Sequence, residues 1–152
     1  MRAHRLVLSF FVISIALAAM PTSAATGRLT MYPLAEMMRS GLIDDYKEHG
    51  IELYWADQLP TRAIEKEIEE DNFTRSANVF ARSDKTGCRA AFEELLEKLI
   101  KEAESRGANA LVGIRSFHDE LPDYSSATDI RCDVGKFRAV VGFKFRFVKL
   151  AP

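Results

Sequence analysis

Residues 137–147 alternate between an apolar row of side chains and a row that carries the charges. The apolar row is Phe137, Ala139, Val141, Phe143, Phe145 and Phe147, and the row between them is Arg138, Val140, Gly142, Lys144 and Arg146. Successive side chains of a β-strand point to opposite faces, so this alternation predicts a strand with one strongly apolar face. Such a face has to be buried against a second layer of structure.

Residues 84–106 predict that second layer, a long amphipathic helix. The apolar residues of one helical stripe are Ala91, Phe92, Leu95, Leu96, Leu99, Ile100 and Ala103. Ser83 is suited to cap the start of the helix, and Gly107 is suited to end it. The opposite face carries three acids that each precede a base by four residues: Glu94 and Lys98, Glu97 and Lys101, Glu102 and Arg106. We interpret this charged face as solvated.

Further strand-like segments lie on both sides of the helix. They are 28–32, which ends at Pro33, then 51–55, 109–117 and 127–132. A brief helical segment is expected at 34–39, closed by Gly41. Short connections favour antiparallel neighbours, so we predict an α+β fold: a mostly antiparallel sheet with one long helix packed on one face. Residues 26–152 contain no linker, repeat or low-complexity stretch and are predicted to form a single domain.

Residues 61–73 fit two structures. Thr61 could cap a helix in which Ile64 and Ile68 lie one turn apart. The same residues also alternate as a strand would, with one acidic face made of Glu65, Glu67, Glu69 and Asp71. Intrinsic propensity favours the helix, and the pattern alone leaves both structures open.

Residues 1–25 have the three parts of a secretory signal peptide. Arg2 and Arg5 supply positive charge, residues 6–20 form an almost unbroken apolar run, and small residues precede a cleavage point after Ala25. The run is shorter than the roughly 20 residues that a membrane-spanning helix needs. We therefore expect cleavage, a periplasmic location and no membrane span afterwards. Retention of the run as an anchor is the alternative.

The two cysteines, Cys88 and Cys132, are an even pair in a chain expected to be exported. This setting favours a structural disulfide, which would join the first turn of the helix to the penultimate strand. The pair has no CxxC motif and does not have zinc-ligand spacing. Neither cysteine lies near the cleavage point, so a lipoprotein is not expected. A thiol-redox role for Cys88, near a helix N-terminus, is the alternative.

Several kinds of chemistry lack their sequence requirements. A net charge of −1 is not typical of a nucleic-acid-binding protein. The chain has neither GxxxxGK[ST] nor GxGxxG, so no nucleotide cofactor or ATP hydrolysis is expected. It also lacks the GxSxG and HExxH motifs of hydrolases. We therefore expect a noncatalytic protein without a cofactor.

Residues 118–123 are a candidate metal site. His118 could supply a nitrogen ligand, and three neighbouring carboxylates could supply oxygen ligands: Asp119, Glu120 and Asp123. One imidazole with scattered carboxylates is also a common loop composition. A solvated acidic loop between two strands is therefore the alternative.

Four basic residues near the C-terminus are candidates for binding an anionic partner, such as lipopolysaccharide or a membrane surface. They are Lys136, Arg138, Lys144 and Arg146. If residues 63–73 form a strand, its acidic row could instead lie opposite these residues and pair with them.

Five segments carry a resemblance to a known family: YWADQLP, SDKTGC followed by RAAF, GANALVGI, SSATDIRC and FRFVKL. The chain resembles a family of small exported proteobacterial proteins of unknown function over nearly its whole length. Members of this family often carry the label "excinuclease ATPase subunit", which the missing phosphate loop contradicts. The resemblance implies a strand at 63–73 and a disulfide between Cys88 and Cys132.

Two more distant resemblances bear on function. A helix leading into Ala108–Leu111, with cysteines at the helix start and in a later strand, resembles the periplasmic domain of RcsF, which works by protein contacts. This chain lacks the lipidated cysteine, proline-rich tether and second disulfide of that family. GANALVGI resembles the YbjQ-type family, which has a suggested heavy-metal role and assembles into rings. We thus expect an envelope protein partner, with metal binding as the alternative and a homo-oligomer as a further possibility.

Overall fold

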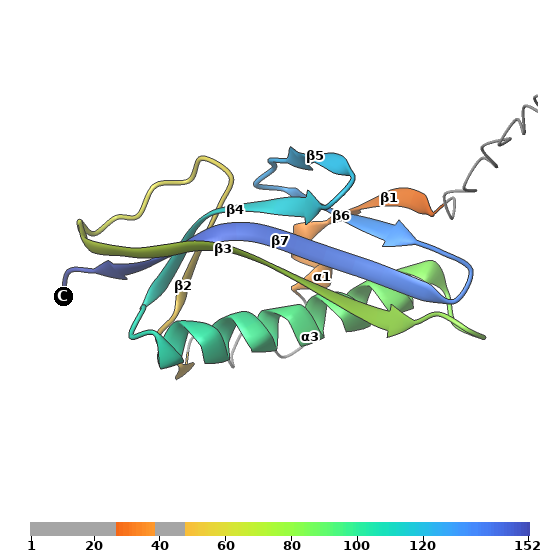
Figure 1. Cartoon of the computed structure of the whole chain (residues 1–152), viewed down its shortest axis with the longest axis horizontal. Coiled ribbons are helices and arrows are strands. Elements are labelled where there is room, and N and C mark those ends of the chain that lie inside the picture. The colour runs from red at the N-terminus through yellow and green to blue at the C-terminus, as the bar shows by residue number, and fades with distance from the viewer. Residues whose placement is uncertain (1–26, 39–47) are drawn as a thin grey trace, which may run out of the picture.

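The computed structural model describes residues 27–38 and 48–152. The elements in chain order are β1 (Arg28–Pro33), α1 (Leu34–Met37), β2 (Glu52–Trp55), β3 (Ile64–Asn78), α3 (Asp84–Ser105), β4 (Ala110–His118), β5 (Leu121–Tyr124), β6 (Asp129–Val134) and β7 (Arg138–Leu150). The expected signal peptide and the end of the brief helix, Arg39 to Gly41, lie outside these residues. Figure 1 shows the long helix α3 running along one face of a twisted sheet.

The sheet contains seven strands of the described chain, and β7 lies at its centre. β3 pairs with one edge of β7 along nearly its whole length. The other edge of β7 pairs with β6 near its start and with β4 further along. β1 continues the sheet beyond β6, and β5 pairs with the end of β4. These pairs are all antiparallel, as predicted for most of the sheet.

β2 pairs with β4 in parallel, which the argument from short connections does not predict. Both β3 and α3 lie between β2 and β4 in the sequence. Such a long connection lets the chain return to the same end of the sheet, and parallel strands require one. The sheet is therefore mixed, with a single parallel pair among the described strands.

The core lies between α3 and β7, and both predicted patterns are present in it. All seven residues of the α3 stripe are buried. On β7, the alternate residues from Ala139 to Phe147 are fully buried. Phe92 of the helix meets Phe143 of the strand edge-to-face, with ring centroids 5.9 Å apart. Phe137 departs from the predicted row and is exposed, because β7 begins one residue later and Phe137 lies in the turn before it.

The ambiguous segment 61–73 is a strand over most of its length, and β3 continues beyond it to Asn78. Tertiary pairing with β7 overrides the helix propensity of the segment. A bulge between Glu67 and Glu69 places two residues of β3 opposite one residue of β7, which shifts the alternation. The predicted acidic face is therefore divided. Glu67 lies away from α3, whereas Glu69 and Asp71 lie on its side.

The predicted disulfide is present. Cys88, the fifth residue of α3, is bonded to Cys132 in β6, with Cα atoms 6.0 Å apart and both side chains fully buried. The helix begins as predicted, since the Ser83 hydroxyl accepts a hydrogen bond from the Thr86 amide at 3.2 Å. None of the helices among the described residues has the length and apolar character needed to cross a membrane.

Candidate functional site

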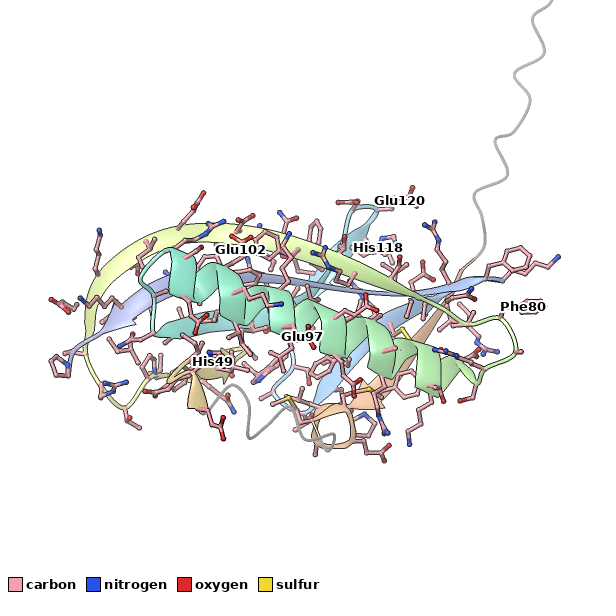
Figure 2. The ribbon with its side chains drawn as sticks, turned by 90° about the horizontal axis from the view of Figure 1, so that it is seen from below. His49, Phe80, Glu97, Glu102, His118 and Glu120 are labelled. Carbon is pink, nitrogen blue, oxygen red and sulfur yellow. A yellow bond between two sulfur atoms is a disulfide. The ribbon has the colours of Figure 1, made fainter. Side chains whose placement is uncertain are left out.

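Three of the sequence candidates, His118, Lys144 and Arg146, lie on the face of the sheet that α3 does not cover, here called the outer face. Its residues include Glu67, Glu70 and Thr74 of β3, Arg115 and His118 of β4, Arg131 and Asp133 of β6, and Val140, Lys144 and Arg146 of β7. Figure 2 labels His118 and Glu120, which project on the far side of the sheet from the helix. Side chains on the other face are buried in the core against α3, so the outer face is the side of the sheet that a ligand can reach.

His118 uses both of its ring nitrogens within the fold. Nδ1 accepts a hydrogen bond from the Glu120 amide at 3.2 Å, which places the ring proton on Nε2. Nε2 lies 3.5 Å from Oδ2 of Asp133, and both side chains are 25% exposed. An imidazole in this arrangement has no free nitrogen lone pair directed at solvent. A metal ion or a substrate proton would have to displace one of these contacts.

The four candidate metal ligands do not converge. Asp123 pairs with Arg115, with Oδ2 and Nε 2.8 Å apart, and Glu120 meets His118 through its backbone amide. Asp119 lines the same cavity as His118. Across residues 27–38 and 48–152, no three His, Cys, Asp or Glu side chains are grouped so that they could hold a metal ion.

Asp133 is the acidic partner of His118, and the sequence pattern did not identify it. It lies on β6, so its contact with His118 depends on strand pairing rather than on a local motif. One signal was available: Asp133 follows the buried Cys132 directly, and neighbouring residues of a strand point to opposite faces. A buried disulfide on one face therefore places Asp133 on the other.

A cavity of about 100 Å³ adjoins this pair. Its lining also includes Leu29, Thr74, Phe117, Arg131 and Val140. Oδ1 of Asp133 is buried and has no hydrogen-bond partner. The cavity is much smaller than the roughly 300–1,000 Å³ of small-molecule sites, and its volume is that of a few water molecules. Water molecules in the cavity can hydrate the Asp133 carboxylate, but the cavity is too small to enclose an ordinary organic ligand.

The four basic candidates divide into two pairs. Lys144 and Arg146 are neutralised across strands, with Lys144 Nζ 3.1 Å from Glu70 Oε1 and Arg146 Nη1 3.0 Å from Glu67 Oε1. This is the pairing that an acidic strand at 63–73 predicts, and each pair contributes at most about 1 kcal/mol. Lys136 and Arg138 lie elsewhere, at the turn between β6 and β7. Within the described chain, neither has a carboxylate within ion-pair distance.

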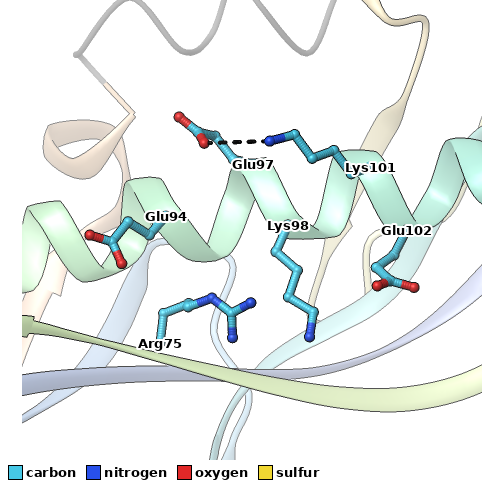
Figure 3. A pocket seen from close by; sticks show the side chains of 6 residues that line it. All are labelled: Arg75, Glu94, Glu97, Lys98, Lys101 and Glu102. Atoms are coloured by element: carbon cyan, nitrogen blue, oxygen red, sulfur yellow. Dashed lines mark ion pairs between the residues drawn. The ribbon is translucent and has the colours of Figure 1, made fainter.

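The charged face of α3 borders an open hollow of about 460 Å³ beside β3 (Figure 3). Its lining is entirely charged: Arg75, Glu94, Glu97, Lys98, Lys101 and Glu102. Glu97 and Lys101 form a predicted pair at 4.0 Å. Lys98 does not form the predicted pair with Glu94; its ammonium lies 4.0 Å from the ring centre of Phe73. Side chains of both charges that do not converge on one point are typical of a solvated face and not of a ligand site.

Arg106 forms a structural cluster where α3 ends. Its guanidinium contacts Glu69 at 2.5 Å and both Asp71 and Glu102 at 3.2 Å. It also lies over the ring of Phe147, with Cζ 4.6 Å from the centroid. The sequence predicted only the contact with Glu102, because the other partners belong to β3.

Glu52, Tyr54 and Arg62 form a second structural cluster. The Tyr54 hydroxyl and the Arg62 guanidinium both donate hydrogen bonds to the Glu52 carboxylate, and Arg62 also donates to the Ala151 carbonyl at 2.8 Å. The hydrogen bond from Tyr54, aided by Arg62, lowers the pKa of Glu52. Burial, followed by the contact with Glu52, raises the pKa of Tyr54. The cluster fixes the C-terminal end of the chain to β2.

Comparison with known proteins adds no assignment to this geometry. No family model matches the chain, and no curated protein matches it significantly. The inference of function therefore depends on the surfaces of the molecule. Both ring nitrogens of His118 have contacts within the fold, whereas several large apolar side chains are exposed to solvent.

Proposed function

We propose that the chain is a noncatalytic periplasmic protein of the α+β class that acts by binding another protein of the cell envelope. The observation that carries this proposal is the pattern of β1. Leu29 and Met31 are 44% and 45% exposed, whereas Thr30 between them faces the buried Cys132. This strand presents its large apolar residues to solvent, which marks a surface that a partner covers.

The position of β1 supports the same proposal. It lies at one end of the strand order, and among the described strands it pairs with β6 alone. The opposite edge of such a strand offers backbone N–H and C=O groups to an added strand. Arg131 lies opposite Met31 in the register, so an acidic residue of the partner has a cation beside the apolar pair.

The buried disulfide supports export, because such bonds persist in oxidising compartments such as the periplasm. The resemblance to a small exported family and to the RcsF periplasmic domain agrees with this location and with a role in protein contacts. The contacts of His118 support a noncatalytic role, since proton transfer or metal binding would first have to break them.

Photocrosslinking in intact cells tests the proposal. A photoreactive amino acid at Met31 is expected to give one discrete adduct with an envelope protein. The matched control position is Leu59, an apolar residue that is 83% exposed in a loop. When Leu29→Asp is added to the protein that carries the photoreactive amino acid at position 31, the adduct is expected to disappear, because the substitution places a charge in the apolar contact. Equal adducts at both positions would contradict the proposal, and an adduct of two identical chains would replace the partner with a homo-oligomer.

A further inference from the structure

Two loops meet at one end of the molecule. The loop between β3 and α3 and the turn between β6 and β7 are joined by a hydrogen bond from the Val79 amide to the Phe137 carbonyl, at 3.0 Å. We call this end the tip and define it by its exposed residues: Phe80, Arg82, Lys136, Phe137 and Arg138. Figure 2 shows Phe80 projecting beyond the ribbon at this end.

The aromatic side chains of the tip are unusually exposed. Phe80 is 71% exposed and Phe137 is 55% exposed, although both belong to a residue type that is normally buried. The loop that carries Phe80 is held in place: the Asn78 side chain accepts a hydrogen bond from the Phe80 amide at 2.7 Å. The backbone that presents Phe80 to solvent is therefore held by a local hydrogen bond.

The exposed charges of the tip itself are all positive, and one carboxylate, Asp133, lines the hollow beside Phe137. Arg82, Lys136 and Arg138 have no carboxylate within ion-pair distance in the described part of the chain. Of the nearest acidic residues along the chain, Asp84 pairs with Arg28. Asp133 contacts His118 through Oδ2, and its other oxygen is buried, so it does not form an ion pair with the tip cations. Most other basic residues of β7 and β4 are paired, as Lys144 and Arg115 illustrate. The tip thus combines unpaired cations with exposed phenylalanines.

The chain also enters the described fold at the tip. Gly27, the first described residue, lines a hollow together with Lys136, Phe137 and Arg138. The apolar run at 6–20 is therefore attached to the end of the molecule that carries these residues.

We infer that the tip docks on the surface of an anionic lipid bilayer. Lysine and arginine near a membrane are attracted to anionic headgroups, and phenylalanine enters the boundary between headgroups and acyl chains. The tip supplies both groups on adjacent loops. This inference shares with the proposed function only the requirement that the protein is exported. The tip is a different surface from the exposed apolar residues of β1.

Vesicle sedimentation of the purified full chain tests the inference. The probes are vesicles of phosphatidylcholine alone and vesicles that also contain phosphatidylglycerol. The wild type is expected to bind the anionic vesicles in a salt-sensitive manner and to bind phosphatidylcholine weakly. K136Q/R138Q is expected to reduce affinity for anionic vesicles by at least about tenfold. F80A/F137A is expected to reduce it with every charge retained.

K144Q/R146Q is the matched control. It removes the same amount of charge, but from positions of β7 that are already paired with Glu70 and Glu67. It is expected to bind like the wild type, and circular dichroism verifies that all variants fold. An equal loss in the control and in the tip variant would overturn the inference, as would a wild type that ignores anionic vesicles. Binding of an acidic protein without vesicle binding would also overturn it.

A gain of signal provides an independent measurement. Trp55 is the single tryptophan of the chain and is buried, so it reports little on the surface. Phe80→Trp places a second indole at the tip. Its emission is expected to shift to shorter wavelength when anionic vesicles are added, because the ring leaves water. An unchanged spectrum in the presence of bound vesicles would show that the tip is not the surface in contact.

Discussion

At the scale of single residues, one arginine connects three parts of the structure. Arg106 follows α3, contacts two carboxylates of β3 and one of the helix, and covers the Phe147 ring. Its side chain is only 23% exposed, so its contacts are better shielded from water than those of an ordinary surface pair. Its removal would leave three carboxylates close together.

We expect Arg106→Gln to lower the free energy of unfolding by about 1–2 kcal/mol, through lost ion pairs and lost packing on Phe147. Lys101→Gln is the control, because its exposed pair with Glu97 spans 4.0 Å. That control is expected to change stability by less than about 0.5 kcal/mol. Urea unfolding measures both. An equal loss of unfolding free energy in both variants would mean that the Arg106 cluster stabilises the fold no more than an exposed ion pair does.

The Glu52 cluster predicts a dependence on pH. The hydrogen bond from Tyr54 lowers the folded-state pKa of Glu52 below its ordinary value of 4.5. The resulting stabilisation is complete above that value and is lost as the pH falls through the folded-state pKa. Tyr54→Phe is therefore expected to destabilise the protein at neutral pH and to differ less from the wild type at about pH 3. A difference in unfolding free energy that stays constant with pH would contradict this.

At the scale of elements, β7 passes very close to its neighbours at Gly142. A Cβ atom at this position would lie 2.7 Å from the Phe117 carbonyl oxygen and 2.8 Å from Cγ2 of Thr74. The Phe117 contact is with backbone, which cannot rotate away. Glycine at this point allows β4 to run beside the central strand.

Gly142→Ala is expected to lower the free energy of unfolding by about 1–3 kcal/mol, because the strands would have to separate locally. Gly135→Ala is the control, since the added Cβ would meet only the Arg138 carbonyl oxygen at 3.5 Å. Thermal or urea unfolding compares the two. A loss of unfolding free energy no larger than that of the control would show that β4 can move away from Gly142 at little cost.

The elements with local signals were predictable. The cap at Ser83, the apolar stripe and Gly107 placed the helix within one residue of α3. The last residues of β3 were not predicted, because their strand structure depends on pairing with β7. β5 was missed because four residues that include Pro122 carry little strand signal. In the same way, Cys88 and Cys132 could be paired by counting, whereas the contact of His118 with Asp133 required the register of the sheet.

At the scale of the whole molecule, the disulfide links the covering helix to the sheet. It spans a sequence separation of 44 residues, and both cysteines are fully buried. In the chain-entropy model, closing a loop of this size stabilises the fold by about 4 kcal/mol. The bond therefore constrains the two layers of the core together.

Cys88→Ala/Cys132→Ala is expected to lower the free energy of unfolding by about 4 kcal/mol. In the wild type, mild reductant is expected to leave the bond intact until urea unfolds the chain, because a thiol cannot reach the buried sulfurs. Thiol labelling followed by mass spectrometry measures this. Rapid reduction of the folded protein would instead favour the thiol-redox role of Cys88.

The central position of β7 determines when this protein can fold. It follows β3, β4 and β6 in the sequence, yet all three of these strands pair with it. A chain emerging from the ribosome therefore lacks the strand that joins its halves, and long-range pairing of this kind forms slowly. In the export that we propose, this order of strands delays closure of the sheet and so favours translocation of a chain that has not yet folded.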